Sequence, residues 1–262
     1  MLLTIDIGNT NVTLGVFDGE VLRATWRMAT DSRKMPDEYG TMFSLMMPLK
    51  GVSPKEITDI AMCSVVPPLT RTFEEVCKTY FHATPLLVGA GVRTGVRILY
   101  ENPRDVGADR VVAAAAAFKI YGGPAIVVDI GTATVFDAVS REGDYLGGAI
   151  APGIQLAAEA LYVNTAQLRR VELVRPKHPI GRNTVASIQS GLVYGYVGLV
   201  EGLVKRFKDE LGQDARVIAT GGLASVIAPE TGVFHVVNPD LMLIGLKLVY
   251  ELNRSNPEEV PR

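Results

Sequence analysis

Two segments of the chain carry an aspartate at the end of an apolar run, followed by a turn of small and hydroxyl residues. Residues 3–19 read LTIDIGNTNVTLGVFDG, and residues 127–143 read VVDIGTATVFDAVSREG. Glycine in such a turn lets the backbone approach a ligand closely. The backbone N–H, hydroxyl and amide groups that follow can donate to an anion. A carboxylate beside these donors can hold a cation, so the pattern predicts a site for nucleotide phosphates and their metal.

A single Asp-Ile-Gly tripeptide would more often be an ordinary hairpin in which the aspartate caps a turn, because short motifs also arise by chance. The repetition of the whole pattern, at Asp6 and again at Asp129, favours the functional interpretation. We therefore expect two related halves that face each other, with the two aspartates and both turns lining a site between them.

The elements that must position these residues also repeat. In the first half, alternating apolar stretches at 2–7, 12–17 and 21–27 predict three antiparallel strands. The corresponding strands of the second half are expected at 125–129, 134–139 and 145–150. Helices are expected at 37–47, 69–81, 109–121, 154–162, 184–211 and 240–252, and further strands at 57–64, 85–88 and 216–219.

The sequence thus predicts an α/β fold with two mixed sheets and helices packed against each. The boundary is expected near Gly122–Gly123, because the strand pattern restarts after it. This gives a first half at 1–122, a second half at 123–255 and a tail at 256–262, which we expect to be frayed.

Composition and charge exclude several classes of protein. The net charge of the 262 residues is −2 and no basic stripe is present, which argues against a nucleic-acid binder. Cys63 and Cys77 form neither a disulfide framework nor a zinc site, so reduced thiols in a cytoplasmic protein are expected. Asp6 interrupts the apolar run that begins at Leu2, which argues against an export signal. No stretch approaches the length of a membrane span.

Four segments together resemble the type III pantothenate kinases. They are DIGNTN at 6–11, YENPRDVGADR at 100–110, DIGTATVFD at 129–137 and IGRNT at 180–184, and GGAIAPGI at 147–154 fits as well. The paired hairpins also resemble the wider superfamily of actin, Hsp70 and sugar-kinase ATPases. The resemblance covers essentially the whole chain and implies a duplicated ribonuclease-H-like fold, as in actin-like ATPases, with a cleft between two domains. One departure is Val135-Phe136, where the family often has another threonine.

The resemblance implies an enzyme that uses ATP to phosphorylate pantothenate to 4′-phosphopantothenate, the first step of coenzyme A biosynthesis. Mg²⁺ is then expected with ATP, a monovalent cation (K⁺ or NH₄⁺) at Asp129, and a homodimer as the assembly. The ATP-binding residues implied are Asp6, Ile7, Gly8, Asn9, Thr10, Asn11, Val12, Thr13 and Thr132. The substrate-binding residues implied are Tyr100, Gly107, Ala108, Asp109, Arg110 and Thr184.

Several of these residues also have an ordinary structural interpretation. Asp109 stands in the first turn of a predicted helix, where a carboxylate is favourable with the helix dipole. The resemblance instead makes it the general base that accepts the proton of pantothenate's primary hydroxyl. Arg110 is either a solvated helix residue or a bidentate partner of the substrate carboxylate. Tyr100 alone would be a half-buried tyrosine at a strand end, and Thr184 a helix N-cap. A carboxylate such as Asp129 suits K⁺ and Mg²⁺ alike.

Three other functions are compatible with the same superfamily: a sugar or acetate-type kinase, a non-catalytic transcription accessory relative, and a polyphosphate phosphatase. The Gly107–Arg110 segment with the upstream Tyr100 separates this chain from the first. The presence of Asp6, Asp109 and Asp129 and the absence of a basic stripe argue against a non-catalytic transcription accessory relative. Finally, glycines at 191, 195, 198 and 202 of a long apolar helix mark either a dimer face or close packing within the second half.

Overall fold

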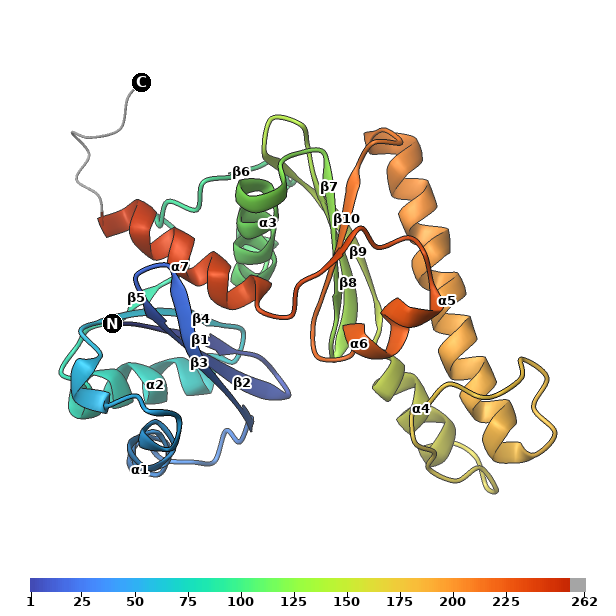
Figure 1. Ribbon diagram of the computed structural model, residues 1–262, viewed down its shortest axis with the longest axis horizontal. Coiled ribbons are helices and arrows are strands. Elements are labelled where there is room, and N and C mark those ends of the chain that lie inside the picture. The colour runs from blue at the N-terminus through green and yellow to red at the C-terminus, as the bar shows by residue number, and fades with distance from the viewer. Residues whose placement is uncertain (255–262) are drawn as a thin grey trace. The chain divides into compact units, whose positions relative to one another are not determined.

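The computed structural model describes residues 1–254, which form two compact units (Figure 1). Unit 1 comprises residues 1–95, 102–116 and 242–254, and unit 2 comprises residues 96–101 and 117–241. The units differ from the expected halves, 1–122 and 123–255, mainly because the last helix belongs to unit 1. The predicted tail at 256–262 lies outside the described residues.

Unit 1 contains a five-stranded mixed sheet in the order β3-β2-β1-β4-β5. The strands are β1 (Leu2–Ile7), β2 (Asn11–Asp18), β3 (Val21–Ala29), β4 (Asp59–Ser64) and β5 (Leu86–Leu87). The helices are α1 (Pro36–Met46), α2 (Pro67–Tyr80), the first part of α3 (Ala108–Tyr121) and α7 (Leu241–Arg254). Short 3₁₀ turns occur at Pro48–Lys50, Pro54–Glu56 and Pro103–Asp105.

The two faces of this sheet carry different side chains, because successive residues of a strand point to opposite sides. One face forms a large apolar core with α1 and α2, from Leu3, Ile5, Ile7, Ile60 and Met62 of the strands and Tyr39, Phe43 and Phe73 of the helices. The opposite face is lined by small residues and packs against α3 and α7, through Ala61, Cys63, Val112, Leu246 and Val249. The apolar stripe of α7 explains why this helix belongs to unit 1.

Unit 2 contains a six-stranded mixed sheet in the order β11-β10-β7-β8-β9-β6. The strands are β6 (Arg97–Ile98), β7 (Ala125–Ile130), β8 (Ala133–Val139), β9 (Asp144–Pro152), β10 (Arg216–Thr220) and β11 (Val236–Val237). The helices are α4 (Ile154–Val163), the long α5 (Thr184–Leu211) and α6 (Ala224–Ile227), followed by a 3₁₀ turn at Ala228–Glu230. Helices α4, α5 and α6 share one apolar core with the sheet, including Val128, Phe136, Leu192, Tyr196 and Val217.

The structure confirms the predicted duplication. In each unit an antiparallel meander of three strands adds two parallel strands in the same order, β3-β2-β1-β4-β5 and β9-β8-β7-β10-β11. A register shift between the second and third strand also recurs, at Val16/Phe17 and at Ala138/Val139. Every predicted helix and strand is present, with ends within two residues of those expected. The short elements β6, β11 and α6 were not expected.

Candidate active site

Asp6 lies on the face of the unit 1 sheet that α3 and α7 cover. Its neighbours Ile5 and Ile7 are fully buried in the core on the other face, so strand alternation places Asp6 opposite them. The parallel pairing of β1 with β4 sets Asp6 directly beside Cys63. An acidic side chain thus stands at the end of a buried strand, on a face lined by small residues.

Asp109 lies near the same thiol, so two of the predicted aspartates come close to one point of unit 1. Burial raises the pKa of the Cys63 thiol well above its usual value, and the negative charges of Asp6 and Asp109 raise it further. The thiol is therefore neutral, and the negative charge in this part of unit 1 is carried by carboxylates. Such a cluster attracts a cation or a substrate bound together with one.

The carboxylate of Asp109 is held by the start of α3. Its Oδ1 accepts a hydrogen bond from the backbone N–H of Arg110 at 2.9 Å. Gly107, the residue before the helix, leaves room for this oxygen, since a Cβ there would lie 2.4 Å from it. The carbonyl of Gly107 accepts from Arg110 and Val111 at 3.1 and 3.3 Å, which begins the helix. Asp109 and Arg110 are half-buried, so both remain accessible to a ligand.

The loop that the sequence predicts to bind phosphate, here called the first phosphate loop, joins β1 to β2 through residues 8–11. The N–H of Gly8 donates to the carbonyl of Asn11 at 3.0 Å and closes the turn, while Asn9 and Thr10 are exposed. Thr30, the residue that follows β3, donates to two carbonyls of this loop, from its hydroxyl to Gly8 and from its N–H to Thr10. Sequence reasoning missed Thr30, because only the pairing of β2 with β3 brings it to the loop.

In unit 2, Asp129 holds the position that Asp6 has in unit 1, at the end of the first strand of its meander. Its carboxylate lies against Gly221, where a Cβ would be 2.2 Å from Oδ1 and 2.7 Å from the nitrogen of Ile130. Gly221 has a φ of +90° and follows β10, which pairs with β7 so that Thr220 is beside Asp129. This turn therefore needs glycine for its conformation and for the space that Asp129 occupies.

Thr132 lies in the shorter second turn and is exposed. Its carbonyl accepts from the N–H of Gly153, the residue that precedes α4, at 3.0 Å. The second predicted phosphate turn is thus tied to the beginning of a helix, where backbone N–H groups favour anions.

Tyr100 lies in a different part of unit 2. It follows β6, at the edge of the sheet, and its ring lies over Gly147 of β9 and 6.4 Å from the ring of Tyr145. Tyr145 in turn donates to the buried carboxylate of Asp137 at 2.8 Å. Two strands, β8 and β9, lie between β6 and β7, so Tyr100 and Asp129 are not neighbours on this sheet.

Thr184 is the first residue of α5 and is exposed. The ordinary interpretation of Thr184 as the N-cap is wrong, because Asn183 has that role and its Oδ1 accepts from the N–H of Ala186 at 2.9 Å. Gly181 lies directly against the first turn of the helix, since a Cβ there would be 2.3 Å from the nitrogen of Ser187. The cap leaves the Thr184 hydroxyl available for a ligand.

Within residues 1–254, no three acidic, histidine or cysteine side chains converge as a complete metal site. Magnesium bound to a nucleotide needs only one or two carboxylates, since phosphate oxygens and waters supply the other ligands. Asp6, next to the loop that is predicted to bind phosphate, is a carboxylate of this kind. In the same range, no helix is both long and apolar enough to cross a membrane.

Solved structures share this architecture. A Campylobacter jejuni protein assigned to the Baf family of transcriptional activators matches with a TM-score of 0.61 at 18% identity, covering 96% of this chain and 98% of that one. A Sinorhizobium meliloti protein assigned as a 2-dehydro-3-deoxygalactonokinase matches with a TM-score of 0.55 at 13% identity, covering both chains fully. At these identities the likeness shows the fold alone. The repeated strand order, together with this likeness, defines a duplicated ribonuclease-H-like fold of the actin-like type.

The sequence comparisons identify the family within that class. The sequence model of the type III pantothenate kinases matches residues 2–206. The type III pantothenate kinase of Dehalococcoides mccartyi strain 195 is 51% identical over 97% of this chain and 98% of its own length. This chain belongs to the type III pantothenate kinase family.

Proposed function

We propose that this chain transfers the γ-phosphoryl group of ATP to the 4′-hydroxyl of pantothenate, the first step toward coenzyme A. The main support is the family match over residues 2–206, together with a relative of that name at 51% identity. Solved structures assigned to the alternative functions resemble this chain in fold alone. The match to the type III pantothenate kinases extends to the sequence.

Asp109 is proposed as the general base. Its Oδ1 is engaged by the N–H of Arg110, which fixes the carboxylate and leaves Oδ2 to accept the proton of the attacking hydroxyl. The hydroxyl oxygen then forms a bond to the γ-phosphorus as the bond from that phosphorus to ADP breaks. In a loose transition state the proton leaves late, so the reaction does not require a strongly basic group.

Arg110 is proposed to bind the carboxylate of pantothenate, because a guanidinium can make two parallel hydrogen bonds to it. Gly107 and Ala108 would bring the backbone close to the same substrate. Tyr100 and Thr184 are proposed as further contacts, as the family resemblance implies.

The phosphates of ATP are proposed to bind Asp6–Thr13 and Thr132. Thr132 and the loop residues Asn9 and Thr10 are exposed, and both turns are braced by backbone hydrogen bonds, which supports this role. The kinase family implies a divalent metal with ATP, and Asp6 is the carboxylate that would hold Mg²⁺ or its waters. Bound there, the metal would neutralise charge on the transferring phosphoryl group.

Asp129 is proposed as the ligand of a monovalent cation, K⁺ or NH₄⁺. The carbonyl of Ile130 lies beside its carboxylate, since a Cβ on Gly221 would be within 2.7 Å of the one and 2.2 Å of the other. The Ile130 carbonyl also accepts from the N–H of Leu223 at 3.0 Å, and its second lone pair, with the Asp129 carboxylate, would supply oxygen ligands to such a cation.

A homodimer that works in the cytoplasm is proposed as the active form. Support comes from the glycine face of α5, where a Cβ added at Gly191, Gly195 or Gly198 would meet nothing within 4 Å. These positions are exposed within unit 2 and would let a second copy approach closely. Sedimentation of the wild-type protein and of Gly195→Leu tests whether the glycine face of α5 forms the dimer interface. If it does, the variant should dimerise more weakly than wild type, whereas a monomeric protein would sediment unchanged.

One assay tests the proposed reaction. The protein is incubated with ATP, Mg²⁺, K⁺ and pantothenate, and phosphopantothenate is measured by mass spectrometry. Glucose, acetate and water alone serve as acceptor controls for the rival activities. Phosphopantothenate as the main product, formed faster in potassium than in sodium, is the expected result. Phosphorylation of a control acceptor, or no transfer to pantothenate, would overturn it.

A further inference from the structure

Thr30 binds two carbonyl groups of the first phosphate loop. Its hydroxyl donates to the carbonyl of Gly8 at 2.6 Å, and its backbone N–H donates to the carbonyl of Thr10 at 3.0 Å. We propose that Thr30 is a positioning residue for ATP, which acts by orienting the peptide groups of this loop toward the phosphates. The inference rests on the proposed function of residues 6–13 as the ATP-binding loop.

The geometry of the peptide bond explains the effect. In a trans peptide the C=O and N–H groups point in opposite directions. When the hydroxyl of Thr30 holds the carbonyl of Gly8, the N–H of Asn9 in the same peptide must point away from Thr30. The second bond, to Thr10, anchors the far side of the loop to the end of β3. An N–H group fixed in this way is ready to donate to an anion without reorganising.

The second half of the protein shows what Thr30 adds. Ala29 pairs with Asn11 as Pro152 pairs with Ala133, so Gly153 is the counterpart of Thr30. Gly153 makes the same backbone bond, to Thr132 at 3.0 Å, but it has no side chain. A Cβ at Gly153 would lie 2.1 Å from the carbonyl of Thr132.

The lengths of the two turns account for this difference. The first turn has four residues between paired positions, 8–11, and the second has three, 131–133. The longer turn makes room for a side chain that the shorter one excludes. The hydrogen bond from a side-chain hydroxyl is therefore specific to the first phosphate loop. This agrees with the different roles proposed for the two aspartates, Asp6 with Mg²⁺ and Asp129 with a monovalent cation.

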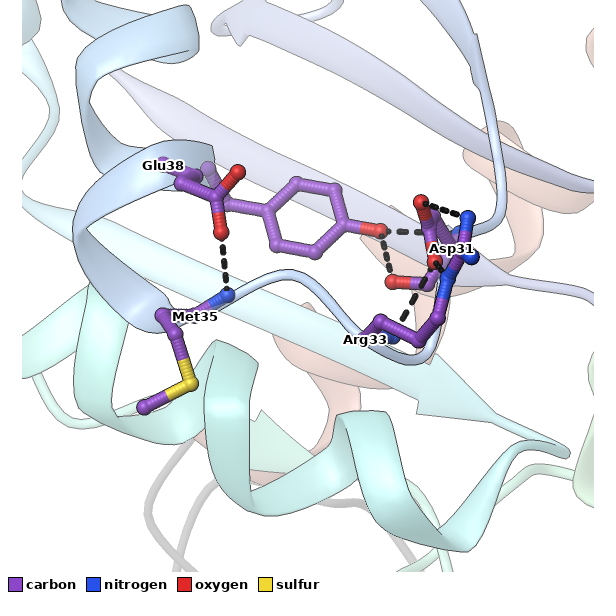
Figure 2. Close-up of polar contacts among 5 residues, drawn as sticks. Asp31, Arg33, Met35 and Glu38 are labelled. Carbon is purple, nitrogen blue, oxygen red and sulfur yellow. Dashed lines mark hydrogen bonds and ion pairs between the residues drawn. The ribbon is translucent and has the colours of Figure 1, made fainter.

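The backbone next to Thr30 is anchored to the core of unit 1. The next residue, Asp31, donates its N–H to the hydroxyl of Tyr39 at 3.1 Å and accepts from that hydroxyl at 3.0 Å. Figure 2 shows this segment, in which Arg33 pairs with the carboxylate of Asp31. The ring of Tyr39 is fully buried and lies 4.7 Å from that of Phe73. A rigid aromatic core thus fixes the backbone that presents Thr30 to the loop.

Thr30→Val tests the inference, because valine keeps the branched shape and the backbone N–H but loses the hydroxyl. We expect the Kd and the KM for MgATP to rise about three- to tenfold, the worth of one hydrogen bond. The KM for pantothenate and kcat should stay within about twofold of wild type. Thr30→Ser should restore nucleotide binding, and Thr30→Ala provides a second variant without the hydroxyl.

Thr4→Val is the matched control. The Thr4 hydroxyl also donates to a carbonyl of the same hairpin, that of Gly15 at 3.1 Å, but in the middle of the paired strands and away from the loop. The Thr4→Val substitution should lower the melting temperature of the protein without changing the Kd for MgATP. An unchanged Kd in both Thr30→Val and Thr30→Ala, or an equal increase in Thr4→Val, would overturn the inference.

Measuring the Kd without pantothenate keeps this test separate from that of the proposed function. A wild-type protein that binds MgATP but does not phosphorylate pantothenate would refute the function and leave the role of Thr30 to be decided by the variants.

Discussion

Gly107→Ala should disable the proposed base without disturbing the fold. A Cβ at residue 107 would lie 2.4 Å from Oδ1 of Asp109, whereas non-bonded carbon contacts are comfortable at about 3.5 Å. The carboxylate must therefore move by roughly 1 Å, and it can do so because it is the end of a side chain. The clash then displaces the base and leaves the backbone of α3 in place.

The size of the effect follows from that displacement. A misplacement of about 1 Å in a reacting group costs on the order of a hundredfold in rate, or about 2.7 kcal/mol of transition-state stabilisation. Exchanging glycine for alanine just before a helix costs on the order of 1 kcal/mol of folding free energy. The variant should therefore remain folded and lose about a hundredfold in kcat.

The assay couples ADP release to NADH oxidation at saturating ATP and pantothenate, with thermal unfolding measured in parallel. Gly89→Ala is the matched control, since a Cβ at Gly89 meets nothing within 4 Å, and it should behave as wild type. A kcat near that of wild type in Gly107→Ala would refute the reasoning, because the carboxylate of Asp109 would then have no required position.

Gly221, Asn183 and His235 each give a further prediction. Gly221→Ala should abolish activation by potassium, because its Cβ would lie 2.2 Å from Asp129 Oδ1; an unchanged response in a potassium titration would contradict the proposed cation site. Asn183→Ala should lower the free energy of unfolding by about 1 kcal/mol in urea denaturation through loss of the α5 cap, and Thr184→Ala should not; the reverse order would contradict the cap assignment. Burial lowers the pKa of His235 below its ordinary 6.5, and Lys208 and Arg216 lower it further, so the unfolded chain binds more protons and stability should fall as the pH drops below about 6.5. His235→Asn, which can still accept from the N–H of Val217, should flatten this dependence, whereas an unchanged slope would assign it to other groups.

The sequence predicted the elements of this fold well because its signals are local. Alternating apolar residues and Asp-Ile-Gly turns defined both meanders, and helical spacing of the residues defined the helices, with a glycine stop for the helix at 109–121. The repeat also allowed the two halves to be recognised as related. The location of α7 in unit 1 could not be predicted, since it depends on which sheet face lacks a cover.

The residues that sequence reasoning missed depend on pairing between distant strands. Thr30 reaches the first loop only through the register of β2 with β3, and Gly221 reaches Asp129 only through the parallel pairing of β7 with β10. The cap of α5 was misassigned for a different reason. Asn183 and Thr184 are adjacent and both residue types cap helices well, so composition could not separate them.

Asp109→Asn tests the central proposal most directly. The change keeps the size of the side chain and an oxygen that can accept from the N–H of Arg110, but it removes the base. In single-turnover experiments with bound ATP, we predict that transfer to pantothenate falls by at least about a hundredfold, while the Kd for MgATP is unchanged. Transfer at a rate near that of wild type would contradict the assignment of Asp109 as the general base.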